Sequence, residues 1–426
     1  MCSIGEDDFA DDGGLHLIPI NNDKDTINEN NICKKCNVEN VVVKLNLKTG
    51  QCKNCFLMYV RHKFRASLGS TKVVRRGSNV LLYFNGKPES VIMLDMIHYA
   101  LEQEAFKRLH LFPKIIFIDK SCLFNEAEDK RINRLKSIQN ILQKYPYESY
   151  YTSIGNTEGD SLENLLTFNN HSLYLHDEIL LKETINSFTN LTTRQDFIRQ
   201  LKTNMLIKIA KKIDCKFIFF PDIGTDLATT FLTNVALGRG GYVALDVSFH
   251  DDRHSGIEII RPMRDININE IENYVALCNI ECIDYKDVGQ CFGIESSIQN
   301  LTKNFIEQLQ KTYPSTVSTI FRTGDKIAPN KSKTSNADTE FCIFCKSYLD
   351  FKQSNTLFAT EYSRYISKNL NNQTLDIEQL AENAVNGRQI SEGVVNYDHK
   401  LCHGCRNIFR NCNRNKTEDI LNEYLL

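Results

Sequence analysis

The sequence lacks any long hydrophobic run. No segment approaches the roughly 18 apolar residues that a membrane-spanning helix needs, and the first residues do not combine a basic stretch with an apolar one. We therefore expect neither a membrane protein nor a secreted one, and no membrane partner. An excess of positive charge is also absent, because 51 lysines and arginines stand against 53 acidic residues, for a net charge of −2. A nucleic-acid function would have to depend on local patches.

Charge is distributed unevenly along the chain. Residues 1–30 hold eight acidic residues against the single base Lys24, which indicates a solvated tail. The segment 61–76 has no acidic residue and holds six bases around Phe64, and Gly69 and Gly77 are expected to break regular structure there. Basic side chains neutralise phosphate and aromatic rings stack on unpaired bases, so we predict RNA contact here, although a charge run can also be only a solvated face. The predicted RNA-binding residues are Arg61, Lys63, Arg65, Lys72, Arg75 and Arg76.

Cysteine is abundant, with fifteen residues, of which eight form four Cys-x-x-Cys pairs. This usage is typical of structural zinc in a reducing compartment, so we expect a cytoplasmic protein. Fifteen residues separate the first two pairs, which is the spacing of a zinc ribbon. Four thiolates fill the zinc tetrahedron, so the ion would be structural; the alternative is four buried, unliganded thiols. The predicted ligands are Cys33, Cys36, Cys52 and Cys55.

A second zinc site is predicted toward the other end of the chain, which gives two zinc ions in all. More than fifty residues separate its two pairs, a longer interval than in a ribbon, and His399, His403 and Cys412 are spare ligands nearby. The predicted ligands are Cys342, Cys345, Cys402 and Cys405.

A third group of cysteines admits two interpretations. Cys278, Cys282 and Cys291 supply enough thiols for an iron–sulfur cluster. The first two lie one helical turn apart in an apolar context, however, and free cysteine is often a small buried hydrophobe. We favour the second interpretation.

Apolar runs alternate with helical patterns through the middle of the chain, which predicts an α/β fold with a doubly wound, mostly parallel sheet. The expected strands are 79–84, 114–119, 148–153, 216–220 and 257–260. The expected helices are 91–106, 126–144, 193–213 and 222–237. Beyond about residue 325 the composition becomes polar, as in a linker. We predict an acidic tail (1–30), a zinc ribbon (31–60), a degenerate phosphate-loop α/β domain (61–325), and a linker with a C-terminal zinc-binding region that holds a polar insertion (326–426).

The turn between the first expected strand and the first expected helix lies where nucleotide-binding α/β proteins place a phosphate loop. Its composition argues against ATP, because Pro88 has no amide, and Lys87 and Glu89 add bulk, Glu89 also adding repulsion. The alternative is an atypical loop in which Lys87 reaches phosphate. The residues of this degenerate nucleotide loop are Asn85, Gly86, Lys87 and Ser90.

Three other polar features are expected from their positions. Arg239, Arg261 and Arg264 follow strand or helix ends and should line the ligand crevice. The segment 250–254 is interpreted as a polar loop rather than a metal site, and Asp222 as a helix cap.

Taken in order, these motifs resemble the cytoplasmic tRNA 2-thiolation protein 2 family. The resemblance depends on the ribbon, on Lys-Phe-Arg at 63–65, on the turn at Gly86 and Ser90, on Leu-Gly-Arg-Gly at 237–240 and Arg-Pro-Met-Arg at 261–264, and on the closing Cys-x-x-Cys pairs. It implies an adenine-nucleotide alpha-hydrolase-like fold of the N-type ATP pyrophosphatases, whose active members adenylate a tRNA base and then deliver sulfur to it.

The departures from that pattern imply a non-catalytic subunit. Active members carry a Ser-Gly-Gly-x-Asp-Ser loop, of which only Gly86 and Ser90 are present here. Active members also carry reactive cysteines in a Cys-x-x-Cys beyond the third strand, whereas residues 154–159 of this chain, directly after Ser153, include no cysteine. The resemblance implies a heterodimer whose catalytic subunit transfers sulfur from a thiocarboxylated ubiquitin-like carrier to the wobble uridine of Lys, Glu and Gln tRNAs, with a possible role in protein conjugation by that carrier. The six bases of segment 61–76 would then contact tRNA.

Two rival hypotheses stay open at this point. One is an active ATP-dependent tRNA-modifying sulfurtransferase with an atypical phosphate loop. The other is a zinc-ribbon interaction module that does not bind RNA.

Overall fold

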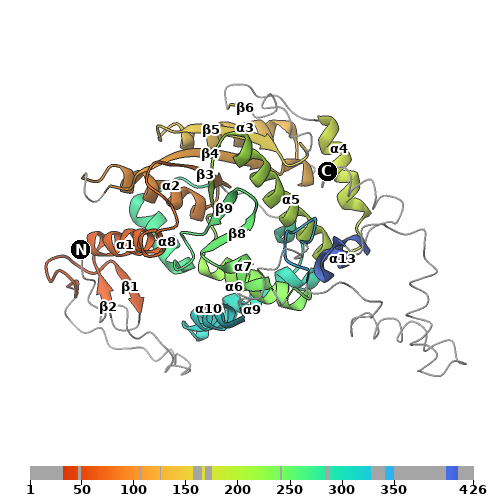
Figure 1. Cartoon of the computed structure of the whole chain (residues 1–426). Helices are drawn as coiled ribbons and strands as arrows, with labels where there is room; N and C mark the ends of the chain where they lie inside the picture. The colour runs from red at the N-terminus through yellow and green to blue at the C-terminus, as the bar shows by residue number, and fades with distance from the viewer. Residues whose placement is uncertain are drawn as a thin grey trace, which may run out of the picture.

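The computed structural model describes residues 32–46, 49–104, 108–124, 126–156, 166–167, 175–239, 242–283, 288–327, 341–349 and 400–410 (Figure 1). Within these ranges, a central sheet carries helices on both faces, and a small hairpin lies beside it (Figure 1). The acidic tail predicted for residues 1–30 and most of the predicted polar insertion lie outside the described residues. No helix of the described part combines the length and apolar character that a bilayer crossing requires.

The central sheet has the strand order β6-β5-β4-β3-β7-β9-β8. The five inner strands are parallel, and the two edge strands run antiparallel to their neighbours. The order reverses between β3 and β7, so their carboxyl ends form the switch point where such sheets bind ligands. The strands are β3 (Ser78–Phe84), β4 (Leu111–Asp119), β5 (Glu148–Ser153), β6 (Leu166–Thr167), β7 (Phe217–Phe219), β8 (His250–His254) and β9 (Ile257–Ile260); the hairpin pairs β1 (Val43–Asn46) with β2 (Thr49–Gln51).

Alternating side chains of the parallel strands enter two separate hydrophobic cores. On β3, Val80 and Leu82 face the core that α1, α2, α3 and α8 cover, whereas Leu81 and Tyr83 face the core that α4, α5 and the C-terminal cysteines cover. The larger helices are α1 (Lys53–Thr71), α2 (Pro88–Leu101), α3 (Glu128–Leu142), α4 (Leu175–Ser187), α5 (Leu191–Lys212), α6 (Gly224–Ala236), α8 (Ile268–Cys278), α9 (Ile298–Thr312) and α10 (Thr316–Ile327). The shorter ones are η2 (Ser121–Phe124), α7 (Val243–Val247), η5 (Val288–Cys291), η6 (Ile294–Ser296) and α13 (His403–Arg410).

The expected doubly wound sheet is confirmed, with two local corrections. The segment interpreted as a polar loop is the edge strand β8, in which Asp251 is fully buried against the guanidinium of Arg253. Gly69, which would be expected to interrupt the basic segment, lies inside α1. Burial of Phe56, Phe64 and other residues of α1 in the first core outweighs the cost of that glycine, which is about 1 kcal/mol.

Candidate functional site

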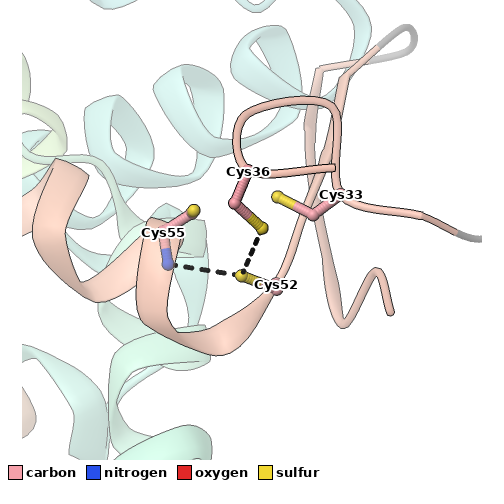
Figure 2. A group of neighbouring side chains, drawn as sticks. All are labelled: Cys33, Cys36, Cys52 and Cys55. Atoms are coloured by element: carbon pink, nitrogen blue, oxygen red, sulfur yellow. Dashed lines mark hydrogen bonds between the residues drawn. The ribbon is translucent and has the colours of Figure 1, made fainter. Parts of the chain in front are cut away.

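Cys33, Cys36, Cys52 and Cys55 converge at the start of α1 (Figure 2). Their sulfur atoms all lie within 4.8 Å of one another, and the Sγ atoms of Cys36 and Cys52 are 3.8 Å apart. A tetrahedral zinc ion with bonds of about 2.3 Å to sulfur places its ligands about 3.8 Å apart. The four thiols can therefore hold a metal ion and are compatible with zinc.

Local backbone geometry presents these four sulfurs to one point. Asn37 has a φ of 56°, and its amide donates to the Cys33 carbonyl at 2.8 Å, which closes the first knuckle. Cys52 is the N-cap of α1 and its sulfur accepts from the Cys55 amide at 3.5 Å. Backbone hydrogen bonds, the largest from Cys36, lower the pKa of Cys33 to about 6. The Cys55 amide also lowers the pKa of Cys52, but burial and Glu39 outweigh it and raise that pKa to about 12, so in the metal-free site the thiolate is favoured at Cys33.

The C-terminal cysteines form a second centre of the same construction. The sulfurs of Cys342, Cys345, Cys402 and Cys405 lie within 4.8 Å of one another, and those of Cys345 and Cys402 are 3.6 Å apart. Lys346 repeats the geometry of the first knuckle, because its φ is 57° and its amide donates to the Cys342 carbonyl at 2.9 Å. As in the first centre, the second pair lies at the start of a helix, here α13. The two distant pairs therefore meet in one site, and the spare ligands are not needed to complete it.

Aromatic packing anchors this second centre to α5. The ring of Phe344 stacks on Phe197 with centroids 5.7 Å apart and meets Phe409 edge-on at 5.3 Å. The Asn204 side chain donates to the Phe344 carbonyl at 3.1 Å. Phe344 is fully buried, so the knuckle is part of the second core and is not a separate appendage.

Arg239 lies beside the second centre and does not line the nucleotide crevice, which corrects the expectation for this residue. Its Nη2 is 2.6 Å from Asp196 Oδ2 and 3.8 Å from Cys405 Sγ. Burial lowers the pKa of Arg239, but Asp196 and the neighbouring thiols outweigh that effect and raise it well above its ordinary value. Arg261 is likewise buried, and its guanidinium donates to the Ser248 carbonyl at 2.9 Å.

The degenerate nucleotide loop lies at the carboxyl end of β3. Asn85 accepts from the Lys87 amide at 2.9 Å, and the Ser90 amide donates to the Lys87 carbonyl at 3.1 Å, so both amides are already bonded inside the loop. Pro88 has no amide to offer. Gly86 has a φ of 79°, and its carbonyl accepts from the Ile283 amide at 3.0 Å. The loop thus offers few donors for a phosphate, and a segment after α8 lies directly against it.

Both acidic and basic groups lie near this loop at the switch point. Asp226, in the first turn of α6, has its pKa raised to about 7 by burial and by the nearby Glu89 and Asp222. Asp222 is not the cap of α6, because the N-cap residue is Ile223. Lys303 and Lys87 also lie near and lower the pKa of Asp226, but burial and the two carboxylates outweigh them. Sequence patterns gave no signal that Asp226 would lie near Glu89.

A buried ion network closes the carboxyl ends of β4 and β5, and it was not predicted. Arg131 of α3 contacts Asp119 at 2.5 Å and Glu178 at 2.5 Å, and Ser153 donates to Glu178 at 2.5 Å. Burial, with help from Glu178 and Asp119, raises the pKa of the adjacent Cys122 to about 12. The edge beyond the third parallel strand therefore holds a salt-bridge network and a neutral thiol.

The predicted RNA-binding bases have two different environments. Arg61 donates to the Tyr274 hydroxyl at 2.9 Å and covers the Tyr99 ring at 3.9 Å, and Lys63 binds the buried Glu270 at 3.0 Å. These two cations are engaged within the protein. Arg65 is half-buried, whereas three residues at the end of α1 and after it are exposed: Lys72, Arg75 and Arg76.

The third cysteine group does not form a cluster. Cys278 and Cys282 are partly buried against the first core, and Cys291 is exposed. Among the described residues, three or more potential metal ligands come together in two places, which are the two four-cysteine centres.

Comparisons with known proteins place these features in a family. A family model described as cytoplasmic tRNA 2-thiolation protein 2 matches residues 297–407. The cytoplasmic tRNA 2-thiolation protein 2 of Anopheles gambiae is 41% identical over 428 residues, which cover 97% of this chain and 100% of that protein. The protein of the same name from Aedes aegypti is 42% identical over 445 residues, with 96% and 98% covered. Both names include the expected compartment.

A solved structure supports the fold. The chain is similar to the U34-tRNA thiolase NcsA of Methanococcus maripaludis, solved with its 4Fe-4S cluster, with a TM-score of 0.52 and 14% identity. The match covers 76% of this chain and 97% of that one. At this identity the likeness concerns the fold alone, and it confirms the expected class. On the evidence of its full-length relatives, the chain belongs to the cytoplasmic tRNA 2-thiolation protein 2 family.

Proposed function

We propose that this chain is the non-catalytic, tRNA-binding subunit of a heterodimer that 2-thiolates the wobble uridine of cytoplasmic Lys, Glu and Gln tRNAs. The other subunit would perform adenylation and would transfer sulfur from a thiocarboxylated ubiquitin-like carrier. Family membership supports the role in tRNA 2-thiolation. The proposal that the other subunit is the catalytic one is supported by the residues at the switch point of the sheet.

This proposal depends on the residues found at two positions, the phosphate loop and the edge beyond the third parallel strand, where active members of the superfamily would bind ATP and carry sulfur. At the first, the Lys87 and Ser90 amides are used within the loop, and the carboxyl groups of Glu89 and Asp226 lie close to it. At the second, the Arg131 network fills the edge beyond the third parallel strand. Adenylation needs a site for ATP, and sulfur transfer needs a reactive thiolate, so neither step is supported in this subunit.

We further propose that both cysteine centres hold zinc. Four sulfurs at tetrahedral spacing leave no open coordination position, so bound zinc would hold each knuckle to the helix that follows it. Metal analysis of the purified chain should find about two zinc ions for the two centres. A value of one, or iron in place of zinc, would contradict this part of the proposal.

The test of the function compares the subunit with the pair. Deletion of the chain should abolish 2-thiouridine in the three tRNAs, measured by mass spectrometry of digested tRNA. In reconstitution, ATP turnover with tRNA should require the partner, and Lys87→Ala should leave the activity of the pair unchanged. Tight ATP binding by the isolated chain that Lys87→Ala removes would instead identify an active enzyme, and unchanged thiolation after deletion would refute the whole proposal.

A further inference from the structure

The amino ends of the parallel strands form a hollow on the side of the sheet opposite the nucleotide loop. Its volume is about 470 Å³, and it lies between the start of β3, at Ser78 and Asn79, and the segment that leads into β7. The Asn79 side chain donates to the Asp214 carbonyl at 3.0 Å, and Lys114 donates to the Ile213 carbonyl at 3.3 Å. These bonds join the approaches to three neighbouring strands into one surface, which we call the amino-edge surface.

The amino-edge surface is strongly basic. It consists of the lining of the hollow, in segments 211–216 and 256–258, and of the adjoining segments 72–79 and 108–114. Together these segments hold eight lysines and arginines, against the acids Asp214 and Glu258 within them and Glu148 beside Lys114. The chain as a whole carries a net charge of −2, so this excess of five positive charges, eight bases less three acids, is local. The eight bases are Lys72, Arg75, Arg76, Arg108, Lys114, Lys211, Lys212 and Lys216.

Three of these eight bases are not engaged in internal ion pairs among the described residues. Lys216 pairs with Glu258 at 3.0 Å, and Lys114 lies 3.5 Å from Glu148. Arg75, Arg76 and Lys211 are exposed and have no ion-pair partner in the described part of the chain. This contrasts with Arg61 and Lys63 on α1, whose cations are bound by internal partners.

Helix stability accounts for only some of these bases. Lys211 and Lys212 lie in the last turn of α5, where cations interact favourably with the helix dipole, and Lys72 is the C-cap of α1. Arg75 and Arg76 lie in the loop after α1, where no helix end needs them. Gly256, at the rim of the hollow, has no atom within 4 Å of its Cβ direction, so a ligand can approach the backbone there.

We infer that the amino-edge surface binds the phosphate backbone of tRNA. The inference builds on the proposed function, which supplies tRNA as the polyanion, and it names the surface that would contact it. Clustered cations next to a hollow attract a phosphate chain because counterions are released on binding. The opposite edge is of mixed charge, because Glu89, Asp222 and Asp226 lie there with Lys87 and Lys303, so it offers no comparable excess of cations. Backbone contact of this kind positions tRNA and carries no base specificity.

The test uses three double substitutions in the full-length chain, alone and with its partner subunit. Arg75→Gln with Arg76→Gln, and Lys211→Gln with Lys216→Gln, remove charge from the amino-edge surface. The matched control, Lys311→Gln with Lys326→Gln, removes two exposed lysines from α9 and α10. Affinity for a labelled tRNA Lys transcript is measured by fluorescence anisotropy over a range of KCl concentrations, and circular dichroism confirms that each variant is folded.

Each surface variant should bind tRNA about 20-fold more weakly at 0.15 M salt, and the slope of log affinity against log salt should fall by about 1.5. The control should behave as the wild type. If the wild type binds tRNA and the Lys211/Lys216 variant matches the control, the amino-edge inference is overturned while the proposed function stands. If the wild type binds no tRNA, alone or with its partner, the proposed function fails and this inference fails with it.

Discussion

Replacing Arg239 should release the C-terminal cysteine centre from the α/β domain. Its side chain is 4% exposed, as is that of Asp196, so the pair is almost completely removed from water. The same guanidinium lies 3.8 Å from Cys405 Sγ. A zinc ion with four thiolates carries a net charge of −2, and a buried cation at this position would offset part of it.

The expected magnitude follows from what Arg239→Ala leaves behind. Removing one partner of a buried ion pair costs about 3–5 kcal/mol, because the other charge stays buried and unpaired. Loss of an outer-shell partner also weakens metal binding by about 10–100-fold. Gly404 reinforces the estimate of tight packing, since a Cβ there would lie 2.6 Å from the Arg239 side chain. Arg239→Lys keeps the positive charge but loses the planar guanidinium, so its unfolding free energy and zinc retention should lie between those of the wild type and Arg239→Ala.

The assay measures stability and metal retention separately. The chain has no tryptophan, so urea unfolding is followed by far-ultraviolet circular dichroism, and zinc release by a chromophoric chelator. Arg322→Ala, an exposed arginine on α10, is the matched control. If Arg239→Ala and Arg322→Ala share one unfolding midpoint and one rate of zinc release, Arg239 does not support the second centre and the reasoning is refuted.

Three further predictions concern other parts of the fold. The raised pKa of Asp226, about 7 against an ordinary 3.8, means that the wild type loses stability as pH rises from about 4 to about 7. Asp226→Asn should therefore raise the unfolding free energy at pH 8 by up to about 4 kcal/mol and leave it unchanged at pH 3.5. Equal gains at both pH values would disprove this prediction. Gly50→Ala would place a Cβ 2.6 Å from the Val41 side chain and should lower the zinc content of the first centre. Gly69→Ala, whose Cβ would meet nothing within 4 Å, should retain both zinc ions and raise the unfolding free energy by up to about 1 kcal/mol. Equal zinc contents in the two variants would contradict the clash at Gly50. Phe344→Ala should cost about 3–5 kcal/mol in urea unfolding, and a loss below 1 kcal/mol would show that the aromatic anchor does not hold the knuckle.

The parallel strands and both cysteine centres were predictable because their signals are local. Strands such as β4 are short apolar runs between helical patterns, and cysteine pairs reveal a metal centre by their spacing. The edge strand β8 could not be recognised in this way. Its residues are polar, and it forms because Asp251 is buried with Arg253 while the backbone pairs with β9.

Side-chain roles were harder to predict than the fold, because the partners are distant in sequence. Lys63 belongs to a basic run, but Glu270, about two hundred residues later, binds its ammonium group. The same limit applies to Arg239. Its local motif predicted a position at the ligand crevice, whereas in the structure it lies beside Cys405. Charge runs indicate where cations are, and only the tertiary structure decides which of them face solvent.

The second cysteine centre also controls how the length of the chain can vary. The Ile343 amide donates to the Lys400 carbonyl at 3.0 Å, and the sulfurs of Cys345 and Cys402 are 3.6 Å apart, so two segments more than fifty residues apart in the sequence are joined at one point. Once such a junction is closed, doubling the intervening length costs only about 0.6 kcal/mol in loop entropy. A change in the number of residues between these two anchor points should therefore change the loop-closure entropy of the second centre by little.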